Sequence, residues 1–515
     1  MRGRPLNLFN SMGRELERFQ PIRDTEARVY SCGPTVYNYA HLGNLRAYVF
    51  TDTLRRTLML KGLDVVHVMN ITDVGHLTSD ADAGDDKMES AAAREKKTVW
   101  DIAAYYTGAF HADVERLGIL PPTQEPKATD YIDKMIAFAQ KLEKDGHTYT
   151  IGDGLYFDTT TVSDYGHLGC LDLEGQEAGS RVEMAEGKRN PTDFCLWKRT
   201  PAGVNRLMEW DSPWGKGAPG WHLECSVMSI DLLGAPFDIH TGGIDHRQVH
   251  HVNEVAQNQG YTGDRHSGVN HWLHNEFLVL GEDKMSKSKG GFLRLQTLLD
   301  QGIHPLVYRY FCLQAHYRKP LVFSWDALVA ARAGLKRLLM RVETLRQKAE
   351  KEGFDAANPP VLEPGSENAS RSLGTLSDAI TEPLSKAGRE WVDKLDEALS
   401  DDLNTPQALA CLNELASAKK LPAEDALRLF ALYDLVLGLR LLKLDPAELV
   451  IRPRDAPLSD AEIQERIAAR VAARKDKDFA KSDAIRDELE AMGIVLMDGA
   501  DGTSWEWRPM LGAPS

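Results

Sequence analysis

The sequence contains no long hydrophobic run and few cysteines. No stretch approaches the roughly 18 consecutive apolar residues of a membrane-spanning helix, and the N-terminal residues lack the apolar run of a signal peptide. The six cysteines are scattered over 515 residues, which does not suit a disulfide framework and fits a reducing compartment. We therefore expect a cytoplasmic protein with no membrane partner.

The sequence also lacks an excess of positive charge. It has 61 Lys and Arg residues against 76 Asp and Glu residues, a net charge of −15. A nucleic-acid partner would have to be bound by local basic patches, because the overall field repels phosphate. The hydrophobic content of 43% is ordinary for a globular protein. The length predicts about three or four domains.

Two common phosphate-binding motifs are absent as well. The chain has neither G-x-G-x-x-G nor G-x-x-x-x-G-K-[ST], so dinucleotide-binding and P-loop predictions lose their main support. In their place, His41-Leu42-Gly43-Asn44 lies between a predicted strand at 28–31 and a predicted helix that ends at Gly62. A second apolar strand at 65–71 completes a βαβ unit of the nucleotide-binding kind.

This tetrad stands at the N-terminus of the predicted helix, where free N–H groups and partial positive charge favour phosphate. His41 and Asn44 can donate hydrogen bonds to the α-phosphate of ATP as charge builds up on it in an in-line displacement. Gly43 would let the adenine ring approach the backbone closely. A simple helix cap is the alternative interpretation of the tetrad taken alone.

A second motif, Lys284-Met285-Ser286-Lys287-Ser288, follows much later in a polar stretch flanked by glycines. Its two lysines flank small residues on a loop that could close over a triphosphate, although a solvated basic loop would be the default for the pentapeptide alone. Together and in this order, the two motifs resemble the HIGH and KMSKS signatures of class I aminoacyl-tRNA synthetases. The resemblance implies that Lys287 acts with His41 and Asn44 on the developing charge, and that Lys284 shapes the closing loop.

The chain pattern predicts an α/β fold, with a Rossmann-like parallel-sheet catalytic domain that carries an inserted α+β segment, then helical-bundle and small C-terminal domains. The resemblance implies that these C-terminal domains bind tRNA. Short strands among many Gly, Pro and Asp residues mark the insertion, and leucines at helical spacing mark the bundle. The predicted segments are 1–125 (first half of the catalytic domain), 126–220 (inserted connective segment), 221–304 (second half with the lysine loop), 305–352 (helical stem-contact region), 353–388 (linker), 389–445 (helical bundle) and 459–515 (C-terminal anticodon-binding module).

Four potential metal ligands are spread over the two predicted catalytic halves. Cys32 ends the first strand, Cys225 lies in the second half, and His250 stands four residues before Glu254, on one face of a helix. Two thiolates, one imidazole and one carboxylate make a plausible tetrahedral zinc set. We prefer His250 to His251 because of its spacing to Glu254. Each residue taken singly could instead belong to the core, and no C-x-x-C spacing supports the site.

Longer stretches indicate a narrower family. The sequence resembles the cysteinyl-tRNA synthetases in the stretches Cys32–Asn38, Asn70–Asp73, Arg189–Phe194, Ser212–Gly215, Pro219–Ser226 and Lys284–Ser288. The resemblance implies that one zinc ion per subunit binds the substrate's own thiolate through the four ligands named above. It also implies that Thr72, Trp221 and Asp245 line the amino-acid pocket. Trp221 would wall the thiol side, and Asp245 would face the α-ammonium or the ribose.

The implied reaction has two steps. The cysteine carboxylate attacks the α-phosphate of Mg²⁺-bound ATP, and the terminal ribose hydroxyl of tRNA(Cys) then takes the cysteinyl group from the adenylate. Zinc holds a soft thiolate far better than a serine hydroxyl, so discrimination would need no editing site. We therefore expect a monomeric enzyme with ATP, L-cysteine and tRNA(Cys) as partners and Zn²⁺ and Mg²⁺ as cofactors.

The sequence departs from the family pattern at a few positions. Asn44 replaces the second His of HIGH, Lys289-Gly290-Gly291 replaces Leu-Gly-Asn after KMSKS, and Val252 replaces the middle carboxylate of Pro-His-His-Glu-Asn-Glu. Asp245-His246-Arg247-Gln248 stands where an apolar stretch is commoner. These departures affect the surroundings of the site more than the reaction.

The C-terminal segment combines basic and aromatic residues. Ser459 and Glu462 predict a capping box, and Arg466, Arg470 and Arg474 recur every four residues on one helix face, followed by Phe479. A basic stripe with an exposed aromatic ring suits single-stranded RNA, and the segment resembles the family's anticodon-reading module. A solvated face laced with acidic residues is the alternative.

Three alternative functions remain open from the sequence. A cysteine ligase with an amino-sugar acceptor resembles the catalytic half but typically lacks the C-terminal module. A small HxGH nucleotidyltransferase would lack the zinc set and the further length. An inactive synthetase-like RNA-binding paralogue would be expected to lose His41, Lys287 or a zinc ligand, and this chain retains them all.

Overall fold

The computed structural model describes residues 3–75, 87–171, 186–204, 206–280, 293–353, 369–499 and 502–509. The predicted lysine loop, with Lys284 and Lys287, lies outside these ranges. Within them, no helix is both long enough and apolar enough to cross a membrane.

The catalytic sheet has four parallel strands in the order β10-β9-β3-β4. The strands are β3 (Glu26–Ser31), β4 (Asp64–Met69), β9 (Phe237–Gly243) and β10 (Val269–Asn275). The chain leaves β3 towards β4 and returns on the other side as β9, so the strand order reverses between β3 and β9. Ligands bind in parallel α/β sheets outside the carboxyl ends of the strands at such a reversal, and Cys32 directly follows β3 there.

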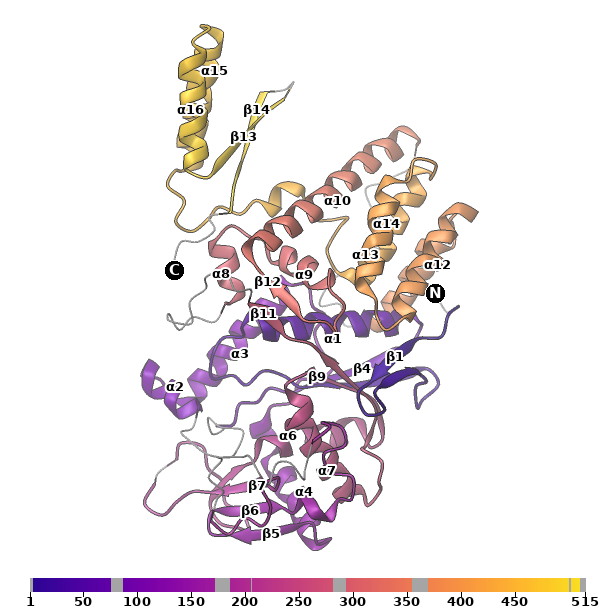
Figure 1. Ribbon diagram of the computed structural model, residues 1–515, viewed down its shortest axis with the longest axis vertical. Helices are drawn as coiled ribbons and strands as arrows, with labels where there is room; N and C mark the ends of the chain where they lie inside the picture. The colour runs from indigo at the N-terminus through magenta and orange to yellow at the C-terminus, as the bar shows by residue number, and fades with distance from the viewer. Residues whose placement is uncertain are drawn as a thin grey trace.

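Helices cover both faces of this sheet (Figure 1). On β3, Val29 belongs to the apolar cluster that contains α1 (Leu42–Leu60), whereas its neighbour Tyr30 belongs to the cluster that contains α6 (Trp221–Leu233) and α7 (His250–Thr262). The alternation follows from the two-residue period of a strand, and burial on both faces explains the apolar runs in the sequence. The predicted βαβ unit is confirmed, and α1 gives way at Lys61 to Gly62, whose φ is 91°.

The inserted segment forms a second, antiparallel sheet in the order β5-β6-β7-β8. Its strands are β5 (Thr148–Ile151), β6 (Gly154–Phe157), β7 (Phe194–Arg199) and β8 (Gly217–Pro219).

The other elements up to residue 323 are β1 (Asn7–Asn10), β2 (Glu15–Arg18), α2 (Lys87–Glu95), α3 (Val99–Arg116), η1 (Ala128–Tyr131), α4 (Ile132–Lys144), η2 (Thr159–Thr161), η3 (His246–Gln248), β11 (Leu278–Leu280), α8 (Leu295–Asp300), α9 (Pro305–Leu313) and β12 (Leu321–Phe323).

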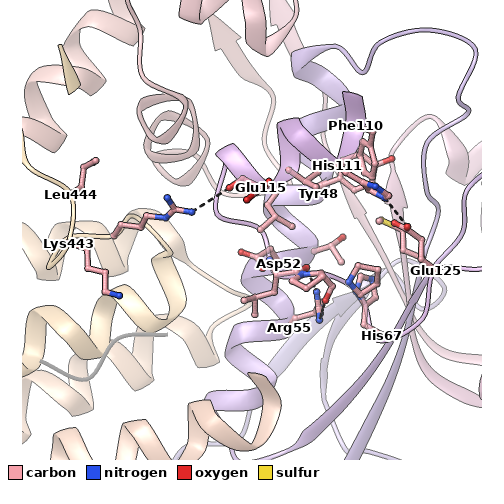
Figure 2. Close-up of a pocket in the computed structure, with 18 of the residues that line it drawn as sticks. Tyr48, Asp52, Arg55, His67, Phe110, His111, Glu115, Glu125, Lys443 and Leu444 are labelled. Carbon is pink, nitrogen blue, oxygen red and sulfur yellow. Dashed lines mark hydrogen bonds and ion pairs between the residues drawn. The ribbon is translucent and has the colours of Figure 1, made fainter. Parts of the chain in front are cut away.

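The helical region begins with the long helix α10 (Trp325–Lys351) and continues through α11 (Ala369–Thr381), α12 (Lys386–Ser400), α13 (Thr405–Ser417) and α14 (Ala423–Leu437). The leucines that predicted this bundle are buried, and they join α1, α9 and α10 in one continuous apolar cluster. Buried charges of α1, among them Asp52 and Arg55, lie between the sheet and the turn that carries Lys443 and Leu444 (Figure 2).

The predicted linker at 353–388 is wrong from residue 369 onward. Helix α11 and the first turn of α12 occupy that part. The prolines that suggested a linker all precede residue 365, whereas Leu373, Ser377 and Ile380 recur at helical spacing and are buried. Packing of this face against α1 and α14 stabilises a helix that composition alone did not indicate.

The C-terminal module consists of two helices, α15 (Asp460–Lys475) and α16 (Phe479–Ala491), and a hairpin of β13 (Ile494–Gly499) and β14 (Gly502–Trp507). The 3₁₀ turn η5 (Pro446–Leu449) precedes it. The predicted capping box of Ser459 and Glu462 is confirmed. The module has its own small apolar core and meets α10 through Lys336, which pairs with Glu506.

Candidate active site

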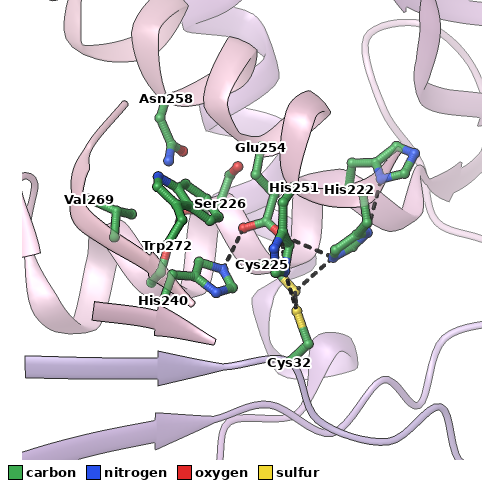
Figure 3. A network of polar contacts seen from close by, with 12 residues as sticks. Cys32, His222, Cys225, Ser226, His240, His251, Glu254, Asn258, Val269 and Trp272 are labelled. Carbon is green, nitrogen blue, oxygen red and sulfur yellow. Dashed lines mark hydrogen bonds and ion pairs between the residues drawn. The ribbon is translucent and has the colours of Figure 1, made fainter. Parts of the chain in front are cut away.

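Four side chains from three parts of the chain meet at the carboxyl end of β3 (Figure 3). The Sγ atoms of Cys32 and Cys225 lie 4.0 Å apart, and His250 Nε2 lies 3.4 Å from Cys225 Sγ. Glu254 Oε1 lies 3.0 Å from His250 Nε2, as the i, i+4 spacing on α7 requires. The structure therefore brings the predicted ligand set together. One potential ligand atom from each residue lies within 4.8 Å of the ligand atoms of the other three.

The donor set fits a tetrahedral metal ion. Zinc–sulfur bonds of about 2.3 Å in a tetrahedron would place two sulfur atoms about 3.8 Å apart, close to the observed 4.0 Å. Glu254 is fully buried, and its Oε1 lies 3.0 Å from His250 Nε2, another member of the set, with no hydrogen-bond partner outside the set among the described residues. A buried carboxylate oxygen in this position is costly unless a cation binds it. Thiolates, imidazole and carboxylate are ligands that zinc prefers.

A surrounding layer of histidines orients these ligands. His222 Nδ1 lies 2.9 Å from His250 Nδ1, which leaves His250 Nε2 towards the cluster, and His240 Nε2 lies 2.9 Å from Glu254 Oε2. His251 stands 3.3 Å from Cys32 Sγ through Nε2. Contacts of this kind fix ring orientation around metal sites. A second possible ligand set keeps Cys32 and Glu254 and has His240 and His251 in place of Cys225 and His250.

Electrostatic coupling within the cluster favours the anionic forms of Glu254 and Cys32. Burial alone would raise the pKa of the Glu254 carboxyl, but His240 and His250 lower it to about 2. Burial alone would lower the pKa of His250, but the Glu254 carboxylate and Cys32 raise it to about 10. Despite burial, Cys225, His251 and His246 hold the pKa of the Cys32 thiol well below its usual range. The cluster therefore favours negative charge on Glu254 and Cys32, whereas the contact with Cys32, together with burial, raises the pKa of the Cys225 thiol well above its usual range. A bound metal ion would take the place of the protons on Cys225 and His250.

Two glycines at the carboxyl ends of β3 and β9 allow neighbouring segments to lie very close to the backbone. A Cβ atom at Gly33 would lie 1.5 Å from the carbonyl oxygen of Asn70, and one at Gly242 would lie 2.6 Å from His251 Cε1. Neither position has room for a side chain. Gly33 also donates its N–H to Asn70 Oδ1 at 2.9 Å, so the turn after Cys32 is tied to the end of β4.

The tetrad His41–Asn44 forms the N-terminal cap of helix α1, the alternative role that the sequence offered for it. Asn44 N donates to His41 Nδ1 at 3.1 Å, and His41 N donates to Asn44 Oδ1 at 3.2 Å, a reciprocal capping box. Burial lowers the pKa of His41, against the opposing charge of Asp245, so the imidazole is neutral at pH 7. Since Nδ1 accepts a hydrogen bond, the ring proton sits on Nε2.

The predicted amino-acid pocket shares one cavity with the metal cluster and the tetrad. This cavity of about 510 Å³ is lined by Cys32, Cys225 and His250, by His41, Gly43 and Asn44, and by Thr72, Trp221 and Asp245. The Trp221 ring lies 4.4 Å from the His250 ring, and Thr72 donates to Glu224 Oε2 at 2.8 Å. The side chain of Asp245 is 61% exposed and therefore accessible to a ligand.

Sequence comparison decides the family. A model of the class I (C) tRNA synthetase catalytic domain matches residues 18–333, a DALR domain model matches 394–438, and a cysteinyl-tRNA ligase anticodon binding domain model matches 456–508. The cysteine–tRNA ligase of Zymomonas mobilis is 53% identical over 98% of both chains, and that of Treponema denticola is 44% identical over 97% of this chain and 99% of its own. This chain belongs to the cysteinyl-tRNA synthetase family. It is an aminoacyl-tRNA ligase.

Solved structures of other class I synthetases share the fold of this cysteinyl-tRNA synthetase family member. A leucyl-tRNA synthetase from Agrobacterium radiobacter, in a ternary complex with tRNA, matches 83% of this chain and 87% of its own, with a TM-score of 0.54 and 11% identity. A methionyl-tRNA synthetase from Mycobacterium tuberculosis, bound to methionyl-adenylate, matches 81% and 90%, with a TM-score of 0.51 and 15% identity. At these identities the likeness establishes the architecture alone.

The predicted RNA-binding stripe of this synthetase is largely occupied by internal ion pairs. Arg470 is 2% exposed and binds both carboxylate oxygens of Asp498 at 2.8 Å, Arg474 binds Asp498 at 2.9 Å, and Arg466 lies 3.3 Å from Glu488. Arg470 therefore holds the hairpin to α15 and is not placed to contact RNA, which corrects that prediction. Phe479 is 61% exposed, as a stacking platform requires.

Sequence reasoning missed the orienting histidines of the site. His222, His240 and His274 contact His250, Glu254 and His251, but they lie in other elements and share no spacing with their partners. Each is buried, and imidazole is an uncommon core side chain. Histidines inside otherwise apolar strand and helix segments were the available signal.

Proposed function

We propose that this enzyme, which attaches cysteine to tRNA(Cys), selects its amino acid through a zinc ion held by Cys32, Cys225, His250 and Glu254. One observation carries the proposal: three of these ligands line the same cavity that His41 and Asn44 border. When bound, zinc supplies a soft site that holds a thiolate far more strongly than a neutral hydroxyl. Serine would then be rejected at binding, without a separate editing site.

The cavity walls would orient the rest of the amino acid. Trp221 packs against His250 and would enclose the thiol side of the substrate, which excludes larger side chains. Asp245 faces the same cavity with an exposed carboxylate and would bind the α-ammonium group or the ribose. Thr72 is held by Glu224 at the end of the β4 segment and would set the depth of the pocket.

Adenylate formation would rest on the N-terminus of α1. The neutral His41 carries its proton on Nε2 and would donate it as a hydrogen bond to the α-phosphate of Mg²⁺-bound ATP, while Asn44 keeps the imidazole in place through the capping box. Gly43 leaves room for adenine beside the backbone. Lys287 and Lys284 would act from their loop on the departing pyrophosphate, as the family resemblance implies.

The tRNA would contact the enzyme in two places, with its terminal ribose at the active site and its anticodon at the C-terminal module. The C-terminal module would read the anticodon with Phe479 and with the exposed parts of Arg466 and Arg474. Because one chain contains the site residues and the anticodon module, we propose a monomer. The six cysteines all lie in the described part of the chain and form no disulfide there, which supports a cytoplasmic setting.

The test is charging of purified tRNA(Cys) with labelled cysteine and, in parallel, labelled serine, with bound zinc measured on the same protein. We expect about one zinc per chain, cysteine charging, and a preference over serine of at least about 10⁴ without product hydrolysis. Charging with no zinc bound would contradict the metal proposal. Cysteinyl-adenylate formation without tRNA charging would favour the amino-sugar ligase instead.

The alternatives have less support. The C-terminal module is matched over 456–508, and an amino-sugar ligase typically lacks it. An inactive RNA-binding paralogue is disfavoured because every predicted ligand and tetrad residue in the described part of the chain is present and assembled.

A further inference from the structure

Three tyrosines at and beside the mouth of the active-site cavity each have a cation over the ring. Measured from the cation to the ring centroid, the pairs are Tyr37 with Lys87 at 5.6 Å, Tyr39 with Arg294 at 4.3 Å and Tyr105 with Lys97 at 4.3 Å. All three distances lie within the range of a cation–π contact. We call these six residues the tyrosine rim.

The tyrosine rim leads from the solvent to the cavity. Tyr37, Tyr39 and Lys87 line the cavity itself. Tyr105 lies on α3, which packs against α2 (Figure 1), and its hydroxyl is 2.6 Å from that of Tyr39. The two rings meet edge to face, with their centroids 6.1 Å apart. A group that contacts Tyr105 is therefore one ring away from the cavity in which the adenylate would form.

Tyr105 is an exposed ring that the fold holds in place. Its neighbours Ile102, Ala103 and Tyr106 are buried, whereas Tyr105 is 47% exposed. Besides the hydrogen bond to Tyr39, its ring packs edge to face on Tyr106 with centroids 5.2 Å apart. An exposed aromatic ring that is already fixed suits base stacking, because little side-chain entropy is lost on binding.

The charge around the tyrosine rim is positive, although the whole chain carries −15. Residues 87–101 contain four basic and three acidic side chains, and Arg294 adds a fifth cation, which leaves two positive charges in excess. A further carboxylate near Arg294, that of Asp113, lies 3.7 Å from Arg116. The three acidic side chains have these partners: Leu207 N donates to Glu89, Arg94 and Lys97 lie 3.1 and 3.5 Å from Glu95, and Asp101 belongs to the capping box of α3.

The pairing of rings with cations matches a single-stranded nucleic acid, in which bases and phosphates alternate. Bases stack on aromatic side chains and phosphates pair with cations, whereas the bases of a duplex are already stacked on each other. Charging requires the terminal ribose hydroxyl of the tRNA to reach the adenylate in this cavity. The unpaired nucleotides next to that ribose must therefore cross the mouth of the cavity.

We propose that the tyrosine rim binds the unpaired nucleotides at the 3′ end of the tRNA. A base stacks on the exposed part of the Tyr105 ring, and a neighbouring phosphate pairs with Lys97. The inference rests on the proposed charging of tRNA and adds the residues that guide the 3′ end into the cavity. Tyr105 is thus a positioning residue for the tRNA and has no role towards cysteine or ATP.

The test measures binding of two RNAs to the full chain: tRNA(Cys), and the same tRNA without its unpaired 3′ nucleotides. Tyr105→Leu should raise the dissociation constant of the complete tRNA about tenfold, because one stacked base is lost, and should leave that of the shortened tRNA unchanged. Tyr105→Trp keeps an aromatic ring and should bind the complete tRNA within about twofold of the parent.

Trp100→Leu is the matched control. Trp100 is also an exposed ring on α3, at 52%, but it lies about 140° around the helix from Tyr105. Its replacement should leave the binding of both RNAs unchanged. Lys97→Met should reduce the slope of log affinity against log salt by about 0.7 for the complete tRNA, the value for one phosphate of a single strand. Cysteine-dependent ATP–pyrophosphate exchange should be the same in the parent and in all four variants.

Three outcomes would overturn the inference. Equal binding of the complete tRNA by the parent and Tyr105→Leu would remove the stacked base. Equal weakening for both RNAs would place the contact elsewhere on the tRNA, and a raised KM for ATP in exchange would assign Tyr105 to ATP. If Tyr105→Leu fails to fold, shown by loss of exchange, Lys97→Met supplies the same comparison of the two RNAs. A parent chain that does not charge tRNA would refute the proposed function as well, whereas the three outcomes above in a charging enzyme refute the tyrosine rim alone.

Discussion

Glu254 Oε1 lies 3.0 Å from His250 Nε2, one helical turn away on α7, and Cys225 Sγ lies 3.4 Å from the same nitrogen. A carboxylate oxygen, an imidazole nitrogen and a thiol sulfur are thus held close together at the end of a parallel sheet. This arrangement requires a cation or a shared proton among the ligands. Replacing any one ligand should therefore change the amount of metal that the protein binds.

Replacing one thiol should remove the metal. We expect Cys225→Ser to retain less than about a fifth of the bound zinc and to raise the KM for cysteine in ATP–pyrophosphate exchange at least about 100-fold, because a hydroxyl is a poor ligand. Cys411→Ser is the matched control, since Cys411 is equally buried but lies in the bundle. Metal content and cysteine affinity equal to the control would contradict the ligand assignment.

The stability of the helical region should depend on His304. This residue caps α9 by accepting a hydrogen bond from Leu306 N. Burial, opposed by the Glu448 carboxylate and aided by Arg440, lowers its pKa to about 4. The unfolded chain takes up a proton near pH 6.5 and the folded chain does not, so the free energy of unfolding falls as pH decreases through this range. Between pH 7.5 and 5 the loss should be about 2 kcal/mol.

His304→Asn keeps a capping side chain that does not titrate. Denaturant unfolding of the variant should show about 2 kcal/mol less pH dependence than the parent over the same interval. An identical pH dependence of both proteins would show that His304 is not responsible.

Removal of residues 453–515 should separate the two steps of the reaction. The C-terminal module has its own apolar core, so the remaining chain should still form the adenylate. We expect unchanged cysteine-dependent ATP–pyrophosphate exchange and a fall of at least about 100-fold in kcat/KM for tRNA charging, a loss that tests whether the module binds RNA. Normal charging by the shortened chain would refute that role.

Two residues of that module should behave differently. Arg470→Met removes the ion pair between a buried arginine and the partly exposed Asp498 and should destabilise the module by about 1–2 kcal/mol. Phe479→Ala removes an exposed ring and should leave stability unchanged while it raises the KM for tRNA about tenfold. Proteolysis of the C-terminal segment and steady-state charging measure the two effects. A stable Arg470→Met protein with weakened tRNA binding would restore the original RNA prediction for that residue.

Local pattern predicted much of the fold and of the site. The βαβ unit follows from apolar strands around an amphipathic helix, and the His250–Glu254 pair follows from i, i+4 geometry. The tetrad also caps α1 because its residues are adjacent. These features depend on near neighbours in the chain.

Long-range contacts could not be obtained in this way. His240 contacts Glu254 only because β9 and α7 pack together, and Arg470 turns inward because Asp498, 28 residues later, meets it across a hairpin. The stripe spacing of the arginines was correct, but spacing cannot tell which face another element covers. Helix α11 was missed for the same reason, because its partners lie on α1 and α14.

Arg56 on α1 and Arg309 on α9 both bind the last turn of α14. Arg56 donates to Leu435 O and Arg309 to Leu437 O, while both hold Asp52. A gene cut between the catalytic segment and the bundle would therefore leave two buried guanidinium groups without their acceptors on α14 and open the shared apolar cluster to water. The catalytic segment and the helical bundle are therefore not units of independent folding, and a minimal adenylate-forming fragment must extend through residue 437.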